Sequence, residues 1–408
     1  MNVLHLQYGS SSSGNYTITL HELMLANGIN SSVLSLFSNF IPKDPSIKWL
    51  GKIPNFKAGI DFKIQKYLNR KNHVEYGDFS YPIFGSDISN HVSVSSADVI
   101  YVHWILNGFL NLKSLSRLAE LGKPMVFVLH DMWTFTGGCH HSFSCEKFTA
   151  SCGNCPVLDG QKEKDRSYKL FKRKEKFFLN KPHLYFVAPS EWMLDRAKAS
   201  NLLKGKDIRN IFNSVSEHIK EKKGRSGKFI PIGYSKRIIG FGANDLMSPY
   251  KGFTFLLEAL QILNRTEGLE DCEVLVFGGN VPMNVTQAIP FKVNFTGFLT
   301  SEHDINEAFN SMDVFIIPSL ADNLPTTVLE SLKCGVPVVG FQTGGIPEII
   351  DHLKNGYLVP KYDAQGLAEG ILYCLNSKIR GYLKSEFASS TIIKGHKSLL
   401  SQILSKAL

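Results

Sequence analysis

The feature that most constrains the fold is an alternation of short apolar runs with amphipathic helical stretches along most of the chain. Near-continuous apolar strands alternating with helices predict parallel sheets covered by helices on both faces. The alternation stops at residues 216–236, where Gly, Ser, Pro and charged residues show little periodicity, and then restarts. We therefore expect an α/β protein with two doubly wound, Rossmann-like domains facing a cleft. The ligand should bind at the carboxyl ends of the strands.

The expected domains are residues 1–215, a linker at 216–236, and residues 237–408, whose last helix is a candidate to cross back to the first domain. Residues 38–97 give no clear pattern. The first helix is expected to end at Gly28. The expected strands are 2–7, 32–36, 99–103, 124–130, 184–187, 208–212, 237–241, 273–277, 293–296, 313–317 and 337–341. The other expected helices are 112–121, 191–199, 252–263, 302–310, 326–333 and 364–375.

Composition excludes several classes of protein. A hydrophobic content of 43% in 408 residues argues against disorder, and no apolar run approaches the roughly 20 residues of a membrane span. The first residues lack the pattern of a secretion signal, so a cytoplasmic protein is expected. The net charge of +9 is distributed unevenly, since residues 151–250 carry +11 and residues 251–350 carry −8. The basic segment suits a nucleic acid, an anionic membrane face or a solvated helix.

The most informative segment is residues 313–350. A predicted strand ends at Pro318, and Asp322 follows in a polar loop just before a helix that carries Glu330. The helix N-terminus, with its free N–H groups and positive dipole, suits a phosphate. Two carboxylates beside it suit a ligand rich in hydroxyl groups. The alternative is a capping Asp and a surface Glu.

The spacing Asp322-x7-Glu330, with PSL before it and ESLKCGVPVV after it, resembles the carboxylate-x7-Glu motif of the retaining GT-B glycosyltransferases of family 4. The stretch TGGIPEII at 343–350 is similar to the loop and helix that follow this motif. The resemblance covers most of the chain. In the family the first carboxylate is usually Glu, and here it is Asp322.

The resemblance implies a hexosyltransferase-type glycosyltransferase that acts in surface polysaccharide or lipopolysaccharide biosynthesis. It would move a sugar, with retention, from a UDP- or GDP-linked donor to a saccharide or lipid-linked saccharide. Glu330 would hold the ribose hydroxyls and Asp322 those of the donor sugar. Backbone amides around Asn323 and Leu324 would meet the pyrophosphate or the sugar.

Lys251, in YKGFTFLLEAL, resembles the family lysine that neutralises the donor diphosphate. The family usually adds an upstream Arg, but the stretch GFGANDLMSPYKG has none, so Lys251 must offset more charge unless another cation helps. The alternative is an ordinary solvated Lys. Two glycines, Gly242 and Gly278, lie where backbone would approach the nucleotide.

In the first half, Gly9 to Gly14 lie between a strand and a helix, where small residues let the backbone approach an anion. A flexible turn is the alternative. His130 ends a strand on the side of the predicted cleft, and the family has a His here that contacts the donor sugar. His103 ends a neighbouring strand and is the second choice.

The mechanism implied by the resemblance is front-face attack, in which the leaving phosphate takes the proton of the acceptor. The protein then acts by electrostatic stabilisation of the leaving diphosphate. We expect no catalytic metal and no hydrolase-like pair of carboxylates across the scissile bond.

Four cysteines cluster in one segment: Cys139, Cys145, Cys152 and Cys155. The Cys-x2-Cys pair at 152 and 155 has metal-ligand spacing, which predicts a structural zinc. Reduced buried thiols and disulfides are the alternatives. The segment also resembles an insert in the colanic-acid-like branch of the family.

Two further interpretations compete with a glycosyltransferase: a GT-B-like sugar-nucleotide epimerase and a nucleic-acid-binding protein. The acidic second half argues against nucleic acid. The stretch KLFKRKEKFFLNK interleaves Leu170, Phe171, Phe177 and Phe178 with basic residues. This suits a helix on an anionic membrane, so peripheral attachment to the inner membrane face is expected. A solvated helix with its aromatics packed inside is the alternative.

Overall fold

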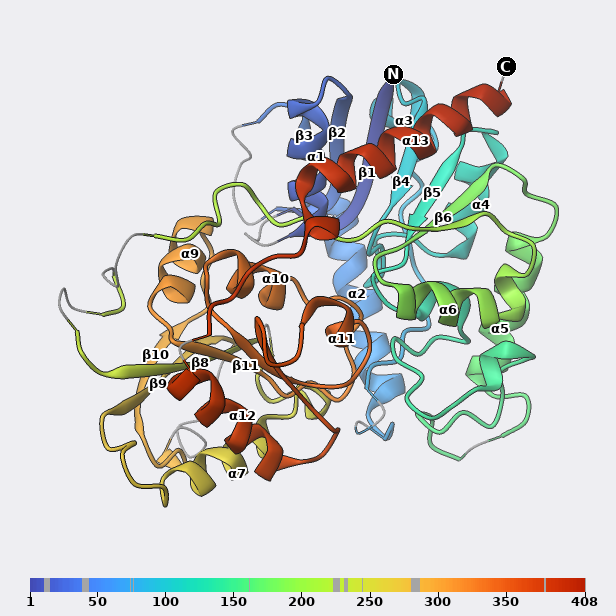
Figure 1. The fold of residues 1–408 in the computed structure, drawn as a ribbon. Coiled ribbons are helices and arrows are strands. Elements are labelled where there is room, and N and C mark those ends of the chain that lie inside the picture. Colours follow the sequence, from blue (N-terminus) through green and yellow to red (C-terminus); the bar gives the residue numbers. More distant parts are fainter. Residues whose placement is uncertain are drawn as a thin grey trace. The chain divides into compact units, whose positions relative to one another are not determined.

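The computed structural model describes residues 1–10, 15–38, 44–73, 75, 77–160, 162–222, 228–230, 234–243, 245–279, 287–377 and 379–407. Contacts divide the chain into two compact units (Figure 1). Unit 1 comprises Met1–Phe212 together with Ser389–Leu408, and unit 2 comprises Asn213–Ala388.

Unit 1 is built on a seven-stranded parallel sheet with the order β3-β2-β1-β4-β5-β6-β7. Successive side chains of β1 enter different cores, since Leu4 packs in one cluster and Val3 in another. Both faces of the sheet are therefore buried, which explains the near-continuous apolar strands. The strands are β1 Asn2–Gly9, β2 Asn30–Phe37, β3 Ile47–Trp49, β4 Val99–Val102, β5 Met125–Val128, β6 Leu184–Ala188 and β7 Ile208–Asn210.

The helices of unit 1 begin at polar caps. The side chains of Asn15, Asn111 and Ser190 each accept a hydrogen bond from a backbone N–H in the first turn that follows. The last helix, α13, packs Ile392 and Leu399 against the β1 side of the core, beside α1 (Figure 1). The helices are α1 Tyr16–Ala26, α2 Lys52–Asn69, α3 Val92–Ser95, α4 Leu112–Glu120, α5 Arg166–Phe178, α6 Glu191–Ala199 and α13 Ser389–Ala407.

Unit 2 holds a six-stranded parallel sheet with the order β10-β9-β8-β11-β12-β13. Its strands are β8 Arg237–Ala243, β9 Cys272–Gly278, β10 Lys292–Gly297, β11 Val314–Ile317, β12 Val338–Phe341 and β13 Gly356–Val359. Its helices are α7 Phe253–Leu263, α9 Glu302–Asn310, α10 Thr326–Lys333, α11 Ile346–Ile349 and α12 Ala364–Ser377. Both sheets reverse their strand order at one point, between β1 and β4 and between β8 and β11. Such switch points are where open α/β sheets bind ligands.

The predicted fold class, two doubly wound parallel-sheet domains, is confirmed. Each predicted strand and helix corresponds to an observed one, and their ends differ by about three residues or fewer. No bounds were predicted for β3, α2, α3, α5, α11, β13 and α13. In the expected linker, residues 223–227 and 231–233 lie outside the described residues.

The membrane-facing interpretation of the aromatic residues in α5 is wrong. Leu170, Phe171, Phe177 and Phe178 are buried in the core of unit 1. Lys174 is buried with them, and its Nζ donates to the carbonyl oxygens of Trp133 and Thr136. The alternative, a helix that packs its aromatics into the first domain, is confirmed. None of the helices in the described ranges combines the length and the hydropathy that a membrane-spanning segment needs.

Candidate functional site

Lys251 and Asp322 meet at the switch point of unit 2. Lys251 ends a short 3-10 helix, Pro249–Lys251, after β8, and Asp322 lies in the loop after β11. The Lys251 Nζ lies 2.8 Å from Asp322 Oδ2. Burial alone would lower the pKa of Lys251, but the Asp322 carboxylate outweighs it and raises the pKa overall. The ammonium therefore stays charged at this edge of the sheet.

Backbone contacts hold these two loops together. The N–H of Leu320 donates to the carbonyl oxygen of Tyr250 at 2.7 Å. Gly252 has a φ of 71°, and a Cβ there would lie 1.9 Å from the carbonyl oxygen of Pro318. Only glycine fits this close approach, which fixes the position of Lys251 beside the end of β11.

The loop after β12 supports Asp322 from another side. The N–H of Gly345 donates to the carbonyl oxygen of Asn323 at 2.7 Å, and Thr343 Oγ1 donates to that of Leu320 at 3.1 Å. Gly344 has a φ of 56°, and a Cβ there would lie 1.6 Å from the carbonyl oxygen of Asp322. The TGG stretch thus acts as a brace for the Asp322 loop.

Glu330 lies on α10 and is buried, with 6% of its surface exposed. Its side chain forms no hydrogen bond or ion pair within the ranges that the structure describes. Burial raises its pKa to about 7, and the nearby charge of Glu302 adds to this effect. A buried carboxylate without a partner is costly, so this position suits a ligand that donates hydrogen bonds to it.

The N-terminus of α10 has no side-chain cap, because Pro325 precedes its first turn. Its first backbone N–H groups therefore remain able to bind an anion. The sequence did not single out two other residues beside this loop. Ser319 Oγ and Asn213 Oδ1 are buried without a hydrogen-bond partner among the described residues, and Asn213 Nδ2 lies 3.5 Å from the carbonyl oxygen of Leu324. Only the three-dimensional structure reveals such unpaired atoms.

The structure gives internal reasons for the glycines that were predicted to approach the nucleotide. A Cβ on Gly242 would lie 2.3 Å from the ring of Phe277, and one on Gly278 would lie 1.9 Å from the carbonyl oxygen of Ala243. Internal packing therefore accounts for both. Gly9 ends β1, and its carbonyl oxygen accepts from Asn15 Nδ2. Gly14 lies outside the described residues.

In unit 1, His130 belongs to a chain of three histidines on neighbouring strands: His5 lies within β1, His103 directly follows β4, and His130 lies just after β5. His103 Nδ1 lies 3.0 Å from His130 Nε2, and His103 Nε2 lies 2.9 Å from His5 Nδ1. Burial lowers the pKa of His130 to about 4 and places those of His5 and His103 well below their usual value. All three rings are therefore neutral near pH 7.

The three tautomers are coupled, because each N···N contact holds one proton. His5 Nε2 is buried without a hydrogen-bond partner in the described part of the chain. Buried N–H donors are rarely left unpaired, so the favoured arrangement leaves a lone pair on His5 Nε2. With that arrangement, His5 Nδ1 donates to His103 Nε2 and His103 Nδ1 donates to His130 Nε2. His130 therefore carries its own proton at Nδ1. His130 also lines a cavity of about 20 Å³ with Trp104 and Asp131.

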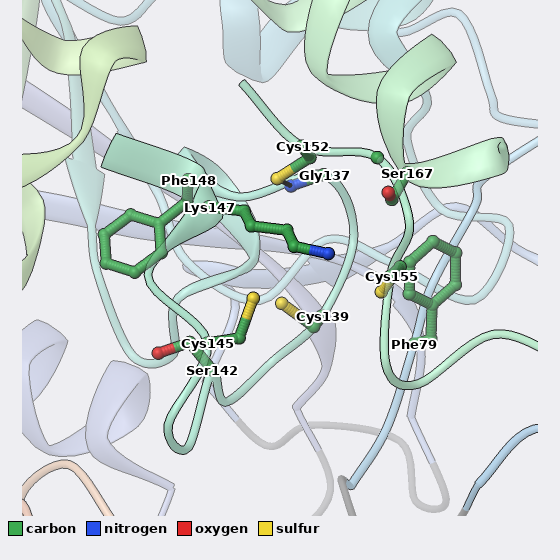
Figure 2. A pocket seen from close by; sticks show the side chains of 11 residues that line it. Phe79, Gly137, Cys139, Ser142, Cys145, Lys147, Phe148, Cys152, Cys155 and Ser167 are labelled. Atoms are coloured by element: carbon green, nitrogen blue, oxygen red, sulfur yellow. Dashed lines mark hydrogen bonds between the residues drawn. The ribbon is translucent and has the colours of Figure 1, made fainter. Parts of the chain in front are cut away.

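The clustered cysteines line a second small cavity of unit 1, of about 20 Å³ (Figure 2). All four are free thiols in the structure, so the disulfide alternative is not seen. The Gly137 N–H lies 3.2 Å from Cys152 Sγ, and burial raises the pKa of Cys152 to about 12. In the described ranges, which include these four residues, no three His, Cys, Asp or Glu side chains are arranged to hold a metal ion.

The structure brings Lys251 and Asp322 into contact, with Glu330 on the helix that follows. Asn323 and Leu324 lie between them, and their carbonyl oxygens face Gly345 and Asn213. The arrangement combines a cation, a helix N-terminus and two carboxylates. It can bind an anionic group that carries hydroxyls.

Several known proteins are similar to this chain in sequence. Residues 236–377 match a family model described as glycosyl transferases group 1. The chain is 27% identical over 268 residues to a putative colanic acid biosynthesis glycosyl transferase, WcaC, of Escherichia coli, covering 63% of this chain and 62% of that protein. It is 31% identical over 133 residues to the amylovoran biosynthesis glycosyltransferase AmsK of Erwinia amylovora, 30% of this chain and 32% of that protein. The matches thus span less than two thirds of these relatives.

Solved structures resemble the whole chain. A sucrose-phosphate synthase from Thermosynechococcus elongatus has a TM-score of 0.68 and 16% identity, with full coverage of both chains. Anabaena HepE in complex with UDP and glucose has a TM-score of 0.60 and 17% identity, over 98% of this chain and all of that one. At such identities the likeness shows the fold, which is the GT-B type.

Proposed function

We propose that the protein is a glycosyltransferase that moves a sugar from a nucleotide-sugar donor to a saccharide or lipid-linked saccharide, with retention of configuration. The single observation that carries the proposal is the contact between Lys251 and Asp322 at the switch point of unit 2. The loop that holds Asp322 leads directly into α10, which carries Glu330. The match of residues 236–377 to the group 1 family supports it.

The donor would bind through complementary charge and hydrogen bonding. The diphosphate is offset by the Lys251 ammonium and by the free N–H groups at the start of α10. Glu330 accepts hydrogen bonds from the ribose hydroxyls, and Asp322 accepts from hydroxyls of the sugar. Donor binding would thus supply hydrogen-bond donors to the buried Glu330 carboxylate, which has no partner among the described residues.

Transfer would proceed by front-face attack. The bond between the anomeric carbon and the phosphate oxygen breaks as the acceptor hydroxyl approaches the same face, and its proton passes to the leaving phosphate. Lys251 and the α10 N-terminus stabilise the charge that develops on the diphosphate. His130 is neutral near pH 7, so its contact with the donor sugar would be a neutral hydrogen bond and not the transfer of a proton from an acid.

The relatives support a role in polysaccharide biosynthesis, since two of them are named for the biosynthesis of colanic acid and of amylovoran. A UDP-linked hexose is the first donor to test, because the structurally similar Anabaena HepE was solved in complex with UDP and glucose. GDP-linked sugars are the second group.

A sugar-nucleotide epimerase is the competing enzyme on this fold. Incubation with each nucleotide sugar and candidate acceptors, followed by product analysis, separates the two. A new glycosidic bond with the anomeric configuration of the donor supports the proposal. A free epimer without transfer contradicts it.

Two further properties belong to the proposal: no catalytic metal takes part, and the protein works at the cytoplasmic face of a membrane. Transfer should therefore persist in a chelator. A structural zinc among Cys139, Cys145, Cys152 and Cys155 would require their side chains to converge, since they are not so arranged here. Elemental analysis of the purified protein tests it, with one zinc per chain as the supporting result.

A further inference from the structure

The helix α2 exposes its apolar side chains. Ile53 and Phe56 are each 73% exposed, Tyr67 is 63% exposed and Ile60 is 41% exposed. Their spacing of three, four and seven residues places them along one side of the 18-residue helix. Four large apolar side chains therefore form a continuous exposed stripe.

The buried side of α2 consists of Ala58, Asp61 and Gln65, so only a small alanine enters the core beside two polar side chains. Asp61 Oδ1 accepts from the backbone N–H groups of Ile83 and Phe84, at 3.1 and 2.9 Å. Gln65 Oε1 accepts from the N–H of Tyr81 at 3.1 Å. The helix is thus attached to unit 1 by the burial of Ala58 and by these hydrogen bonds, and its exposed apolar stripe contributes little to that attachment.

Basic side chains flank the stripe. The only acidic residue of the helix is Asp61, which is buried and engaged. The outward surface therefore carries positive charge with no negative charge to offset it. Six basic residues lie on the helix and directly after it: Lys52, Lys57, Lys63, Lys66, Arg70 and Lys71.

We propose that α2 is an interfacial helix that lies flat on the surface of a bilayer containing anionic lipids, with its apolar stripe inserted at the headgroup boundary. An apolar stripe flanked by lysines is typical of such helices. A protein partner fits less well, because the cores of protein interfaces are depleted in Lys. The proposal does not depend on the transferase activity, although a lipid-linked acceptor would lie at the same surface.

Co-sedimentation of the full chain with vesicles tests the proposal, using vesicles of zwitterionic lipid alone and with added anionic lipid. We expect binding to the anionic vesicles and weak binding to the zwitterionic ones. Ile53→Ser with Phe56→Ser should lower the partition coefficient at least tenfold. Leu179→Ser, at another exposed apolar residue of unit 1, is its control and should leave binding unchanged.

Two charge-reversal variants distinguish lipid binding through α2 from non-specific attraction by the protein's overall positive charge. Lys63→Glu with Lys66→Glu should abolish most binding, whereas Lys169→Glu with Lys176→Glu on α5 changes the net charge equally and should not. Equal losses in both variants would overturn the proposal, as would unchanged binding in the stripe variant. A dimer in solution that Phe56→Ser dissociates, without vesicle binding, would overturn it in favour of a second copy. Circular dichroism and thermal melting confirm that each variant is folded.

Discussion

Lys251 Nζ and Asp322 Oδ2 form an ion pair of 2.8 Å between the loop after β8 and the loop after β11. The pair joins the two strands at the switch point of the sheet in unit 2. In the proposed donor complex, the diphosphate would take over the ammonium and free the Asp322 carboxylate to accept sugar hydroxyls. The ion pair would then hold both groups in position before the donor binds.

The first prediction concerns Lys251→Ala. Loss of the ammonium removes stabilisation of the leaving diphosphate, so kcat should fall by roughly a hundredfold even at saturating donor. Steady-state kinetics measure this, with Lys354→Ala, at an exposed position of unit 2, as the control. Turnover near the wild-type value with saturating donor would contradict the assigned role.

The second prediction concerns the pH dependence of donor binding. The pKa of Glu330 is raised to about 7, and in the proposed donor complex its ionised form would accept hydrogen bonds from the ribose. Donor affinity should therefore rise by about tenfold between pH 6 and pH 8, as the ionised fraction increases. Calorimetric titration at several pH values measures this. A pH-independent affinity, or one that falls with pH, would count against the ribose contact.

The third prediction concerns the stability of Glu330→Gln. The folded state holds a proton on Glu330 that the unfolded chain releases near its ordinary pKa of 4.5. Stability should therefore decrease as the pH rises from 4.5 to about 7, by up to about 3 kcal/mol. Above pH 7 the Gln variant should be more stable than the wild type and yet bind the donor less well. Chemical denaturation at pH 5 and pH 8 tests the first effect.

The fourth prediction concerns the brace beside Asp322. Gly344→Ala forces a Cβ to within 1.6 Å of the Asp322 carbonyl oxygen and also strains a φ of 56°. Gly268→Ala has similar strain, at a φ of 81°, but meets nothing within 4 Å. Gly268→Ala should cost about 1 kcal/mol, and Gly344→Ala should cost more and weaken donor binding. Equal effects on stability and binding would show that the brace has no role.

The fifth prediction concerns the histidine chain. His103→Leu removes the ring that fixes the tautomer of His130. In wild-type protein the ¹⁵N signals of His130 should show one tautomer, protonated at Nδ1, and no titration between pH 5.5 and 8.5. The variant should lose this fixed tautomer and lower kcat more than it changes KM. A His130 signal that titrates near pH 6.5 in the wild type would rule out the buried, coupled chain.

Much of the fold could be predicted from the sequence, because buried parallel strands appear as apolar runs such as DVFII before Pro318. The helix α2 could not, since it exposes Ile53 and Phe56 and buries Asp61, which inverts the pattern that identifies a surface helix. In α5 the basic residues suggested an exposed helix, but Lys174 is buried against Trp133.

The candidate site was predictable where it depends on local spacing. Asp322 and Glu330 are separated by one short loop and little more than one turn of α10, so the motif alone placed them. The contact with Lys251 crosses 71 residues, and the unpaired atoms of Ser319 and Asn213 depend on packing between distant segments. Such relationships have no local pattern in a single sequence.

The most direct test of the proposed donor site is calorimetric titration of UDP- and GDP-sugars into the wild-type protein and three variants: Lys251→Ala, Glu330→Gln and Glu258→Gln. Glu258 is an exposed carboxylate on α7 and serves as the matched control. We expect one donor bound per chain, affinity lowered at least tenfold by Lys251→Ala and by Glu330→Gln, and no change for Glu258→Gln. Undiminished donor binding by the Glu330→Gln and Lys251→Ala variants would contradict the proposed site.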